Sequence, residues 1–334
     1  AVLGVAWEGM GRSQLGTAEP RHFMGHSAGD EAMRVCMLGP QPRMTDNRPQ
    51  PSNPTFAQMR AVIDVLGDDR GPLQESARLS LLSWGELAVP ALQEGAEAVR
   101  MATRTRCRLL LREIEVRGLL ERFGQLRLEQ VGSSSAPGLL DGAVMAAQMV
   151  RTFVPDSRRM AAELRRVASK LRHDCEGRSL PVCARLLAER LHGELGLQGC
   201  DAADLDIGHV LVDRALANGV GAPITLSLIY LLVARWAGLS AAGVALPDHF
   251  LIRLHGPRPL LLDPFHCSRV IPKADCARYL RASGHGRVRE HLRDLSDREV
   301  LIHYLHSLRR ASTVRPARNT RATLGKALEL LETS

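Results

Sequence analysis

The chemistry that this sequence can offer depends first on one histidine and one aspartate, His249 and Asp263. Each lies at the end of a short apolar run, and the segment His255–Pro259 between the two runs has the composition of a turn. A hairpin centred near Gly256 and Pro257 pairs residues whose numbers sum to about 512 or 513, so the imidazole faces Asp263 or its neighbour. In such a pair the carboxylate orients the imidazole, which can act as a general base. The two side chains would be two thirds of a catalytic triad.

The third member, a nucleophile, is expected at the start of the helix that precedes the hairpin. The segment Pro223–Gly238 is apolar on nearly all sides, which predicts a buried central helix with proline in its first turn and glycine at its cap. The positive end of its dipole would lower a thiol pKa, but no cysteine lies between Cys200 and Cys267. The hydroxyls of Thr225 and Ser227 are the alternatives, with Thr225 the better placed, and a water molecule is another.

Other interpretations of the same residues stay open. The pair of His249 and Asp263 could be structural and pin the hairpin to the helix. Cys267 could reach the same cleft from the loop that follows the second strand. His249, His255 and His266 could gather around a metal ion, but two of them lie in turns without acidic ligands at matching spacing. We therefore expect no metal and no cofactor.

The elements that position these residues follow from the apolar pattern. Short apolar runs predict strands over 241–246, 250–254 and 260–262. A helix over about 223–237 should pack against the antiparallel sheet that these strands form. Residues 139–200 contain three further helical runs, and the last extends from Pro181 to about Gly196. The fold class is therefore α+β, with one buried helix on a small antiparallel sheet.

The rest of the chain divides by composition. Residues 1–54 are rich in glycine and proline without a sustained period, which indicates an irregular segment. Residues 55–131 show apolar residues at helical spacing in four short runs, and paired helices of this kind look like a HEAT-type repeat. The Gly132–Gly138 stretch is typical of a linker. Residues 311–334 are expected to form a short C-terminal helical tail.

Composition excludes several classes of protein. The 334 residues are 45% hydrophobic but only 4% aromatic, so the core is mostly aliphatic. No stretch reaches the roughly 18 apolar residues of a membrane helix, and the N-terminus lacks a signal pattern. Seven cysteines without a CxxC motif indicate reduced thiols and a cytoplasmic location. The net charge of +8 comes from scattered arginines without interleaved aromatics, which does not favour a nucleic-acid partner.

Three segments, Gly221–Tyr230, Leu246–Leu251 and Leu262–Phe265, resemble the SirB-like branch of the transglutaminase-like superfamily. That branch shows G-[IV]-P-[IL]-[ST]-L, P-G-H-F and D-P-F segments at similar spacing. The resemblance covers roughly residues 139–310 and implies a papain-like α+β fold in which His249 and Asp263 match the family's histidine and aspartate. A domain of this kind also occurs in a eukaryotic F-box protein.

The resemblance also implies that the usual transglutaminase cysteine is absent across this branch, its place falling near Pro223–Thr225. The sequence departs from the branch at Asp248, where glycine is usual, and in Leu205–Ala217, where the usual Asn-Ser is not obvious. The TPR-like repeats of the family are shortened to about 20 residues after Arg315.

These observations predict a transglutaminase-like domain protein without the thiol nucleophile. We expect a non-catalytic module that binds or scaffolds another protein, with no membrane partner, and with the HEAT-like helices as a second surface. The candidate site, active or vestigial, consists of His249, Asp263 and Thr225. The first alternative is an amide hydrolase or acyltransferase that uses this pair with a hydroxyl or a water. The second alternative is a basic adaptor associated with nucleic acid.

Overall fold

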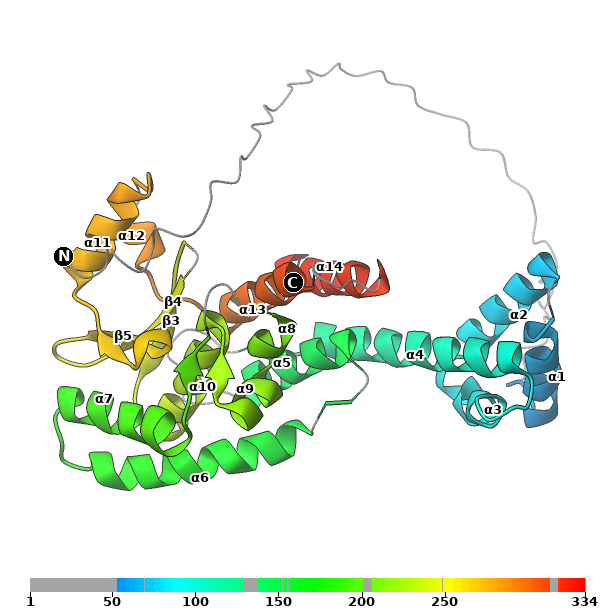
Figure 1. Ribbon diagram of the computed structural model, residues 1–334, viewed down its shortest axis with the longest axis horizontal. Helices are drawn as coiled ribbons and strands as arrows, with labels where there is room; N and C mark the ends of the chain where they lie inside the picture. Colours follow the sequence, from blue (N-terminus) through cyan, green and yellow to red (C-terminus); the bar gives the residue numbers. More distant parts are fainter. Residues whose placement is uncertain are drawn as a thin grey trace, which may run out of the picture. The chain divides into compact units, whose positions relative to one another are not determined.

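The computed structural model describes residues 53–68, 70–128, 137–151, 153–154, 156–200, 206–247, 249–286, 288–312 and 318–333 (Figure 1). Helices dominate the described residues, together with a four-stranded antiparallel sheet and a two-stranded parallel one. Residues 1–52 of the predicted irregular segment, most of the predicted linker and Asp248 lie outside these residues. Among the described helices, none is both long and apolar enough to cross a membrane.

Four helices come first along the described chain. They are α1 (Phe56–Leu66), α2 (Gly71–Trp84), α3 (Val89–Gly95) and α4 (Met101–Gly124), with the 3-10 turn η1 (Gly85–Ala88) between α2 and α3. Pro72 and Pro90 lie in the first turns of α2 and α3, where the N–H that proline lacks has no helical partner. Buried apolar residues of all four helices, among them Met59, Leu81 and Leu92, form one cluster. The four predicted helices are confirmed.

The second and larger core is built from the elements that follow. In chain order these are α5 (Pro137–Val150), α6 (Ser157–Cys175), α7 (Leu180–Ala188), the π-helical turn η2 (Glu189–Glu194), β1 (Gln198–Gly199), α8 (Ile207–Val210), α9 (Val212–Asn218), β2 (Val220–Gly221), α10 (Pro223–Trp236), β3 (Ala241–Leu246), β4 (His249–Leu254), β5 (Leu260–Asp263), the 3-10 turn η4 (Pro264–His266), β6 (Arg269–Val270), α11 (Lys273–Ala282), α12 (Val288–His291), α13 (Asp297–Ala311) and α14 (Arg318–Thr333).

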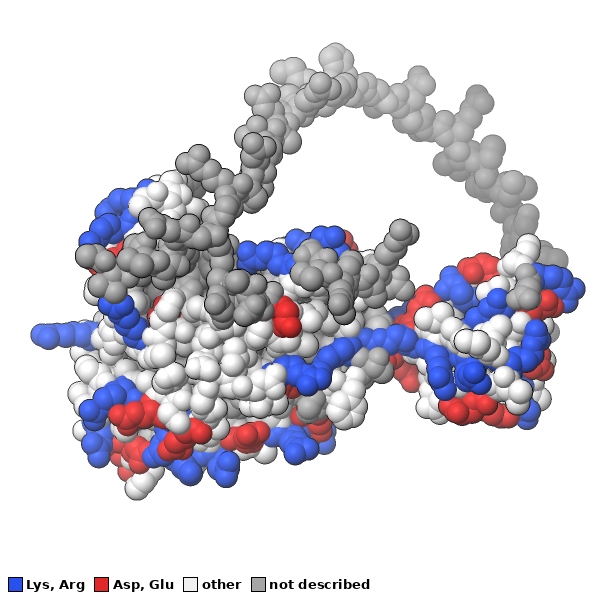
Figure 2. All heavy atoms as spheres, viewed as in Figure 1, with Lys and Arg blue, Asp and Glu red and all other residues white. Residues whose placement is uncertain are grey.

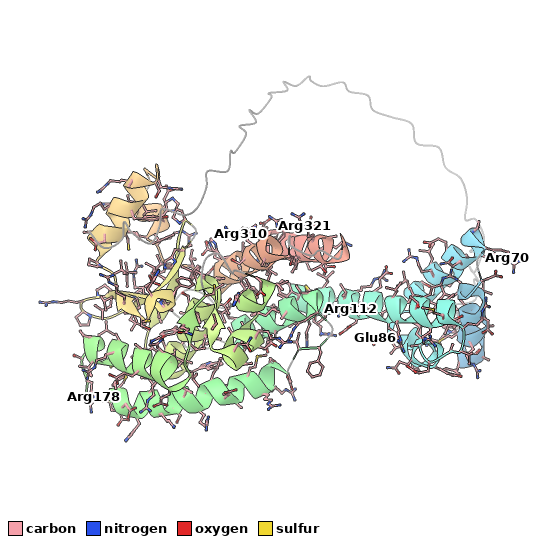
Figure 3. All side chains as sticks on the ribbon, viewed as in Figure 1. Arg70, Glu86, Arg112, Arg178, Arg310 and Arg321 are labelled. Atoms are coloured by element: carbon pink, nitrogen blue, oxygen red, sulfur yellow. The ribbon has the colours of Figure 1, made fainter. Side chains whose placement is uncertain are left out.

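Helix α4 contributes to both cores. Cys107 and Ile114 pack in the cluster of α1–α3, whereas Phe123 near the C-terminal end packs in the larger core. Arg112, labelled in Figure 3, donates a hydrogen bond to the carbonyl oxygen of Gln148 on α5. Helix α14 also packs against α4, α5 and α13. The predicted C-terminal tail is therefore a helix with one face in the core.

Helix α10 is the central element of the larger core. Every residue from Ile224 to Arg235 is buried, because neighbouring elements cover the helix on all sides. Pro223 begins the helix, and Gly238 follows its end with φ 90°, a left-handed conformation that suits glycine. Arg235 donates from Nε to the carbonyl oxygen of Ala241 at 2.9 Å and from Nη1 to Asp297 Oδ1 at 2.5 Å. These bonds tie α10 to β3 and α13.

The four-stranded sheet has the order β3-β4-β5-β6 with antiparallel neighbours. Phe250 and Leu262 belong to the core that contains α10, whereas Leu251 and Leu261 pack in a separate cluster with Leu280 of α11. Because both faces of β4 are covered, its apolar residues run almost continuously. The predicted strands and their packing against α10 are confirmed.

The hairpin register differs from the prediction. Leu254 pairs with Leu260 and Ile252 with Leu262, so paired numbers sum to 514. The loop between β4 and β5 has five residues and is symmetric about Pro257, not about the Gly256–Pro257 bond. Continued along the strands, this register sets Asp263 opposite Leu251, two residues beyond His249. The two side chains therefore meet diagonally across the strand pair.

Candidate functional site

Three polar side chains meet where β4 begins and β5 ends. His249 is the first residue of β4, Asp263 is the last residue of β5, and His266 closes the turn η4. His249 Nε2 lies 2.9 Å from Asp263 Oδ2, and His266 Nδ1 lies 2.7 Å from the same oxygen. The side chains of His249 and Asp263 are only 6% and 5% exposed, whereas that of His266 is 45% exposed. The predicted His–Asp contact is present, and a second histidine joins it.

The local sequence Asp-Pro-Phe-His explains how the carboxylate is held. Asp263 is the N-cap of η4, and its Oδ1 accepts hydrogen bonds from the backbone N–H groups of Phe265 and His266 at 3.1 and 3.2 Å. Pro264 follows at the first position of the turn, where no N–H is required. With Oδ1 held by the main chain, Oδ2 is directed at the two imidazoles.

The charge of Asp263 is stabilised by these contacts. Burial by itself raises the pKa of a carboxyl group, but the imidazoles of His249 and His266 outweigh it and hold the pKa of Asp263 well below its usual range. In return, the hydrogen bond to Asp263 raises the pKa of His266. The aspartate is therefore ionised, and an imidazolium at His266 is favoured beside it.

Phe265 links this cluster to the strands before α10. Its ring lies edge-on to His249 and His266, with centroid distances of 5.9 and 5.0 Å. Phe265 also contacts Gly199 of β1, where an added Cβ would lie 2.6 Å from the Phe265 carbonyl oxygen. β1 pairs in parallel with β2, which ends at Gly221 two residues before α10. The approach is so close that only glycine fits at this position of β1.

The loop after η4 is fixed to α10. Ser268 donates a hydrogen bond from its buried hydroxyl to Tyr230 Oη at 2.7 Å, and Tyr230 is fully buried in α10. Burial raises the pKa of Tyr230 to about 12, so the phenol stays neutral. Cys267 and Ser268 both have positive φ, 53° and 58°, an uncommon conformation for residues with a side chain. Nothing in the sequence pattern indicated this anchor.

The hydroxyls of Thr225 and Ser227, weighed above as replacements for a thiol, lie inside the core. Thr225 and Ser227 are both 0% exposed. Thr225 Oγ1 donates to the carbonyl oxygen of Val210 at 2.8 Å, and Ser227 Oγ donates to that of Phe250 at 2.9 Å. A buried hydroxyl must find an acceptor, and main-chain carbonyls of neighbouring elements supply it. The described hydrogen bonds of Thr225 and Ser227 therefore go to the backbone instead of to His249.

The remaining predicted candidates lie as follows. Cys267 is exposed in the loop after η4, whereas Cys183 and Cys276 are buried in helices and act as packing residues. His255 lies 3.0 Å from Asp294 Oδ2, in a separate ion pair, so the alternative cluster of His249, His255 and His266 does not form. His266 instead joins His249 and Asp263, and its position three residues after Asp263, within one turn, was the available signal.

In a comparison with known protein families, residues 158–306 match the transglutaminase-like superfamily. These residues form a transglutaminase-like domain. It extends from the start of α6 into α13 and contains α10, the four-stranded sheet, His249 and Asp263. Helix α5 lies outside the match, although the predicted range began at residue 139. No curated protein and no solved structure matches the chain significantly.

Proposed function

We propose that the transglutaminase-like domain is non-catalytic and that the protein binds or scaffolds another protein. The proposal rests on one observation, that the N-terminal end of α10 offers no accessible nucleophile. The sequence there has no thiol, and the hydroxyls of Thr225 and Ser227 are fully buried and bonded to backbone carbonyls. A nucleophile must be accessible to substrate and lie within reach of its general base. Neither hydroxyl meets both requirements.

Without a nucleophile, the His249–Asp263 pair has a structural use. Asp263 joins the end of β5, the turn η4 and the start of β4 through its four polar contacts. Charge-assisted hydrogen bonds to a buried carboxylate are stronger than neutral ones. These contacts hold the end of β5 to the start of β4, which supports a structural role for the pair.

The helices α1–α4 supply the proposed binding surface. Of the ten large hydrophobic side chains that are exposed in the described residues, eight lie between residues 56 and 109. They are Phe56, Val65, Leu73, Leu79, Leu87, Val99, Met101 and Leu109. Exposed apolar side chains gathered in one part of a protein favour contact with a partner. We further propose that these helices form a HEAT-like unit and that the domain belongs to the SirB-like branch.

The charge distribution supports a protein partner over nucleic acid. In Figure 2, acidic side chains are interspersed with the basic ones on the visible face. The labelled arginines of Figure 3, such as Arg70, Arg178 and Arg310, come from separate parts of the chain. Arg78 and Arg190 each contact two carboxylates, which lowers the positive charge available to phosphates. A cytoplasmic location remains part of the proposal, on the ground of the seven unpatterned cysteines.

An assay for ammonia release tests the absence of catalysis. The full chain is incubated, with a chelator present, with a peptide that contains glutamine and with a primary amine, and the matched protein is His249→Gln. We expect ammonia release no higher than that of heat-denatured protein. Release by the wild type that His249→Gln abolishes would contradict the proposal. It would favour the second candidate, an amide hydrolase or acyltransferase, which the buried 2.9 Å contact of His249 with Asp263 supports.

Affinity purification tests the binding surface. Leu79 on α2 is 54% exposed, and Val270 on β6, at 49%, is the matched control. We expect at least one protein that is retained by the wild type and by Val270→Glu but lost with Leu79→Glu. If both variants retain the same proteins as the wild type, the assignment of the surface to α2 is wrong.

A further inference from the structure

The cluster of His249, Asp263 and His266 has the composition of a metal site. We propose that these three side chains bind one divalent transition-metal ion, with Zn²⁺ as the reference ion. Each residue offers one ligand atom, and the three atoms all lie within 4.8 Å of one another. Two imidazole nitrogens and one carboxylate oxygen are a donor set used for zinc in enzymes. The residues come from three consecutive elements of the fold, so folding itself assembles the site.

The spacing of the donor atoms is close to what a metal requires. Around tetrahedral zinc, with bonds of about 2.0–2.2 Å, neighbouring donors lie roughly 3.3–3.6 Å apart. Asp263 Oδ2 lies 2.9 Å from His249 Nε2 and 2.7 Å from His266 Nδ1. An outward movement of roughly half an ångström by the histidines would therefore admit the ion. His266 lies at the end of a short turn and is 45% exposed, so it can make that movement toward solvent.

The supporting contacts orient the carboxylate as a ligand. Two backbone N–H groups hold Asp263 Oδ1, so Oδ2 has a fixed direction toward both imidazoles. Ligating carboxylates in metal sites are commonly hydrogen-bonded in this way, and such contacts strengthen binding. The edge-on ring of Phe265 packs against both histidines and limits their rotation. The site is thus held by its surroundings before a metal binds.

Binding exchanges one set of contacts for another. Each imidazole would bind the ion as a neutral ring through the nitrogen that faces Oδ2, with its one proton on the other ring nitrogen, and any second proton of a protonated imidazole would be released to solvent. Three protein ligands leave a coordination position for water on the exposed side of His266. Nitrogen donors favour Zn²⁺ and its neighbours in the first transition row, whereas Mg²⁺ and Ca²⁺ prefer oxygen ligands. This inference does not rest on the proposed function, because it concerns ion binding and not turnover.

Titration of the metal-free full chain with Co²⁺, followed by visible absorption, tests the site. His266→Gln removes one ligand at an exposed position, so the variant should fold. His173→Gln, at an exposed histidine in the last turn of α6, is the matched control. We expect the wild type and His173→Gln to bind one Co²⁺ with equal affinity. Affinity should fall by about tenfold or more in His266→Gln. Zn²⁺ should displace the Co²⁺, and excess Mg²⁺ should not.

The alternative ligands in this chain are its cysteines, and the spectrum separates them. Thiolate ligation adds an intense sulfur-to-cobalt charge-transfer band in the near ultraviolet, which nitrogen and oxygen donors do not produce. The proposal is overturned if the wild type binds no Co²⁺, if the bound form shows that thiolate band, or if His266→Gln loses less than tenfold in affinity. The ammonia assay contains a chelator, so it measures catalysis without a bound metal ion, whereas the Co²⁺ titration measures ion binding alone. Failure of the proposed function is therefore distinguishable from failure of the proposed metal site.

Discussion

Removal of the Asp263 carboxylate should destabilise the protein, and substitution by alanine should cost more than substitution by asparagine. Asp263→Ala removes the cap of η4, which costs about 0.5–2 kcal/mol. It also leaves the buried imidazole of His249 beside a cavity, which costs about 1–3 kcal/mol when a donor loses its acceptor. Because these contacts share one side chain, we expect a combined loss of about 2–4 kcal/mol in the free energy of unfolding. Asp263→Asn keeps an acceptor for the two backbone N–H groups, so it should lose only about 1–2 kcal/mol.

Urea unfolding with a chelator present, followed by tryptophan fluorescence, measures these losses; Trp236 at the end of α10 is one of the three tryptophans that contribute to the signal. Asp64→Ala, at an exposed position of α1, is the control and should stay within about 0.5 kcal/mol of the wild type. The reasoning is refuted if Asp263→Ala costs less than about 0.5 kcal/mol, or if the Asn variant is as unstable as the Ala variant.

The pH dependence of this stability follows from the two shifted groups. Because the folded protein lowers the pKa of Asp263, its contribution is complete above the usual carboxyl range and is lost as the pH falls toward the folded-state value. The hydrogen bond to Asp263 raises the pKa of His266, so that contribution is complete below the usual histidine range and is lost as the pH rises through the raised value. The stability gap between the wild type and Asp263→Asn should therefore be widest at mildly acidic pH and narrow on both sides.

Three further predictions concern single contacts. Gly199→Ala should lower stability by about 1–3 kcal/mol in urea unfolding, since its Cβ would lie 2.6 Å from a backbone oxygen; Gly286→Ala, with open space around it, should be neutral. Thr225→Val should cost about 1 kcal/mol in the same assay and leave any ammonia release unchanged, and a loss of activity would identify a working hydroxyl. Glu299→Gln should cost about 1 kcal/mol at neutral pH. The hydrogen bond from Arg293 lowers the pKa of Glu299 to about 2, so the cost should vanish as the pH falls from about 4.5 toward 2.

Much of the fold could be predicted from local sequence. The apolar run after Pro223 predicts a buried helix because polar residues are nearly absent on every face, and Gly238 marks its end. The strands β3 to β5 follow from short apolar runs around a segment rich in proline and glycine. Contact between His249 and Asp263 follows from a hairpin whose paired numbers have an even sum near 512, since both side chains then lie on the same face of the strands; an odd sum would place them on opposite faces. These features depend on neighbours in the chain, which the sequence displays directly.

Other features were decided only when distant segments packed together. The symmetric five-residue loop changed the pairing sum to 514, because the backbone geometry of the turn, and not the apolar pattern, sets the register. Thr225 became a structural hydroxyl because α8, fifteen residues earlier, presents a carbonyl group to it. His266 contacts Asp263 because Asp263 caps the turn that contains His266. His255 contacts Asp294 instead. The set of residues in the candidate site therefore depends on tertiary packing, because packing decides which polar side chains lie close enough to contact one another.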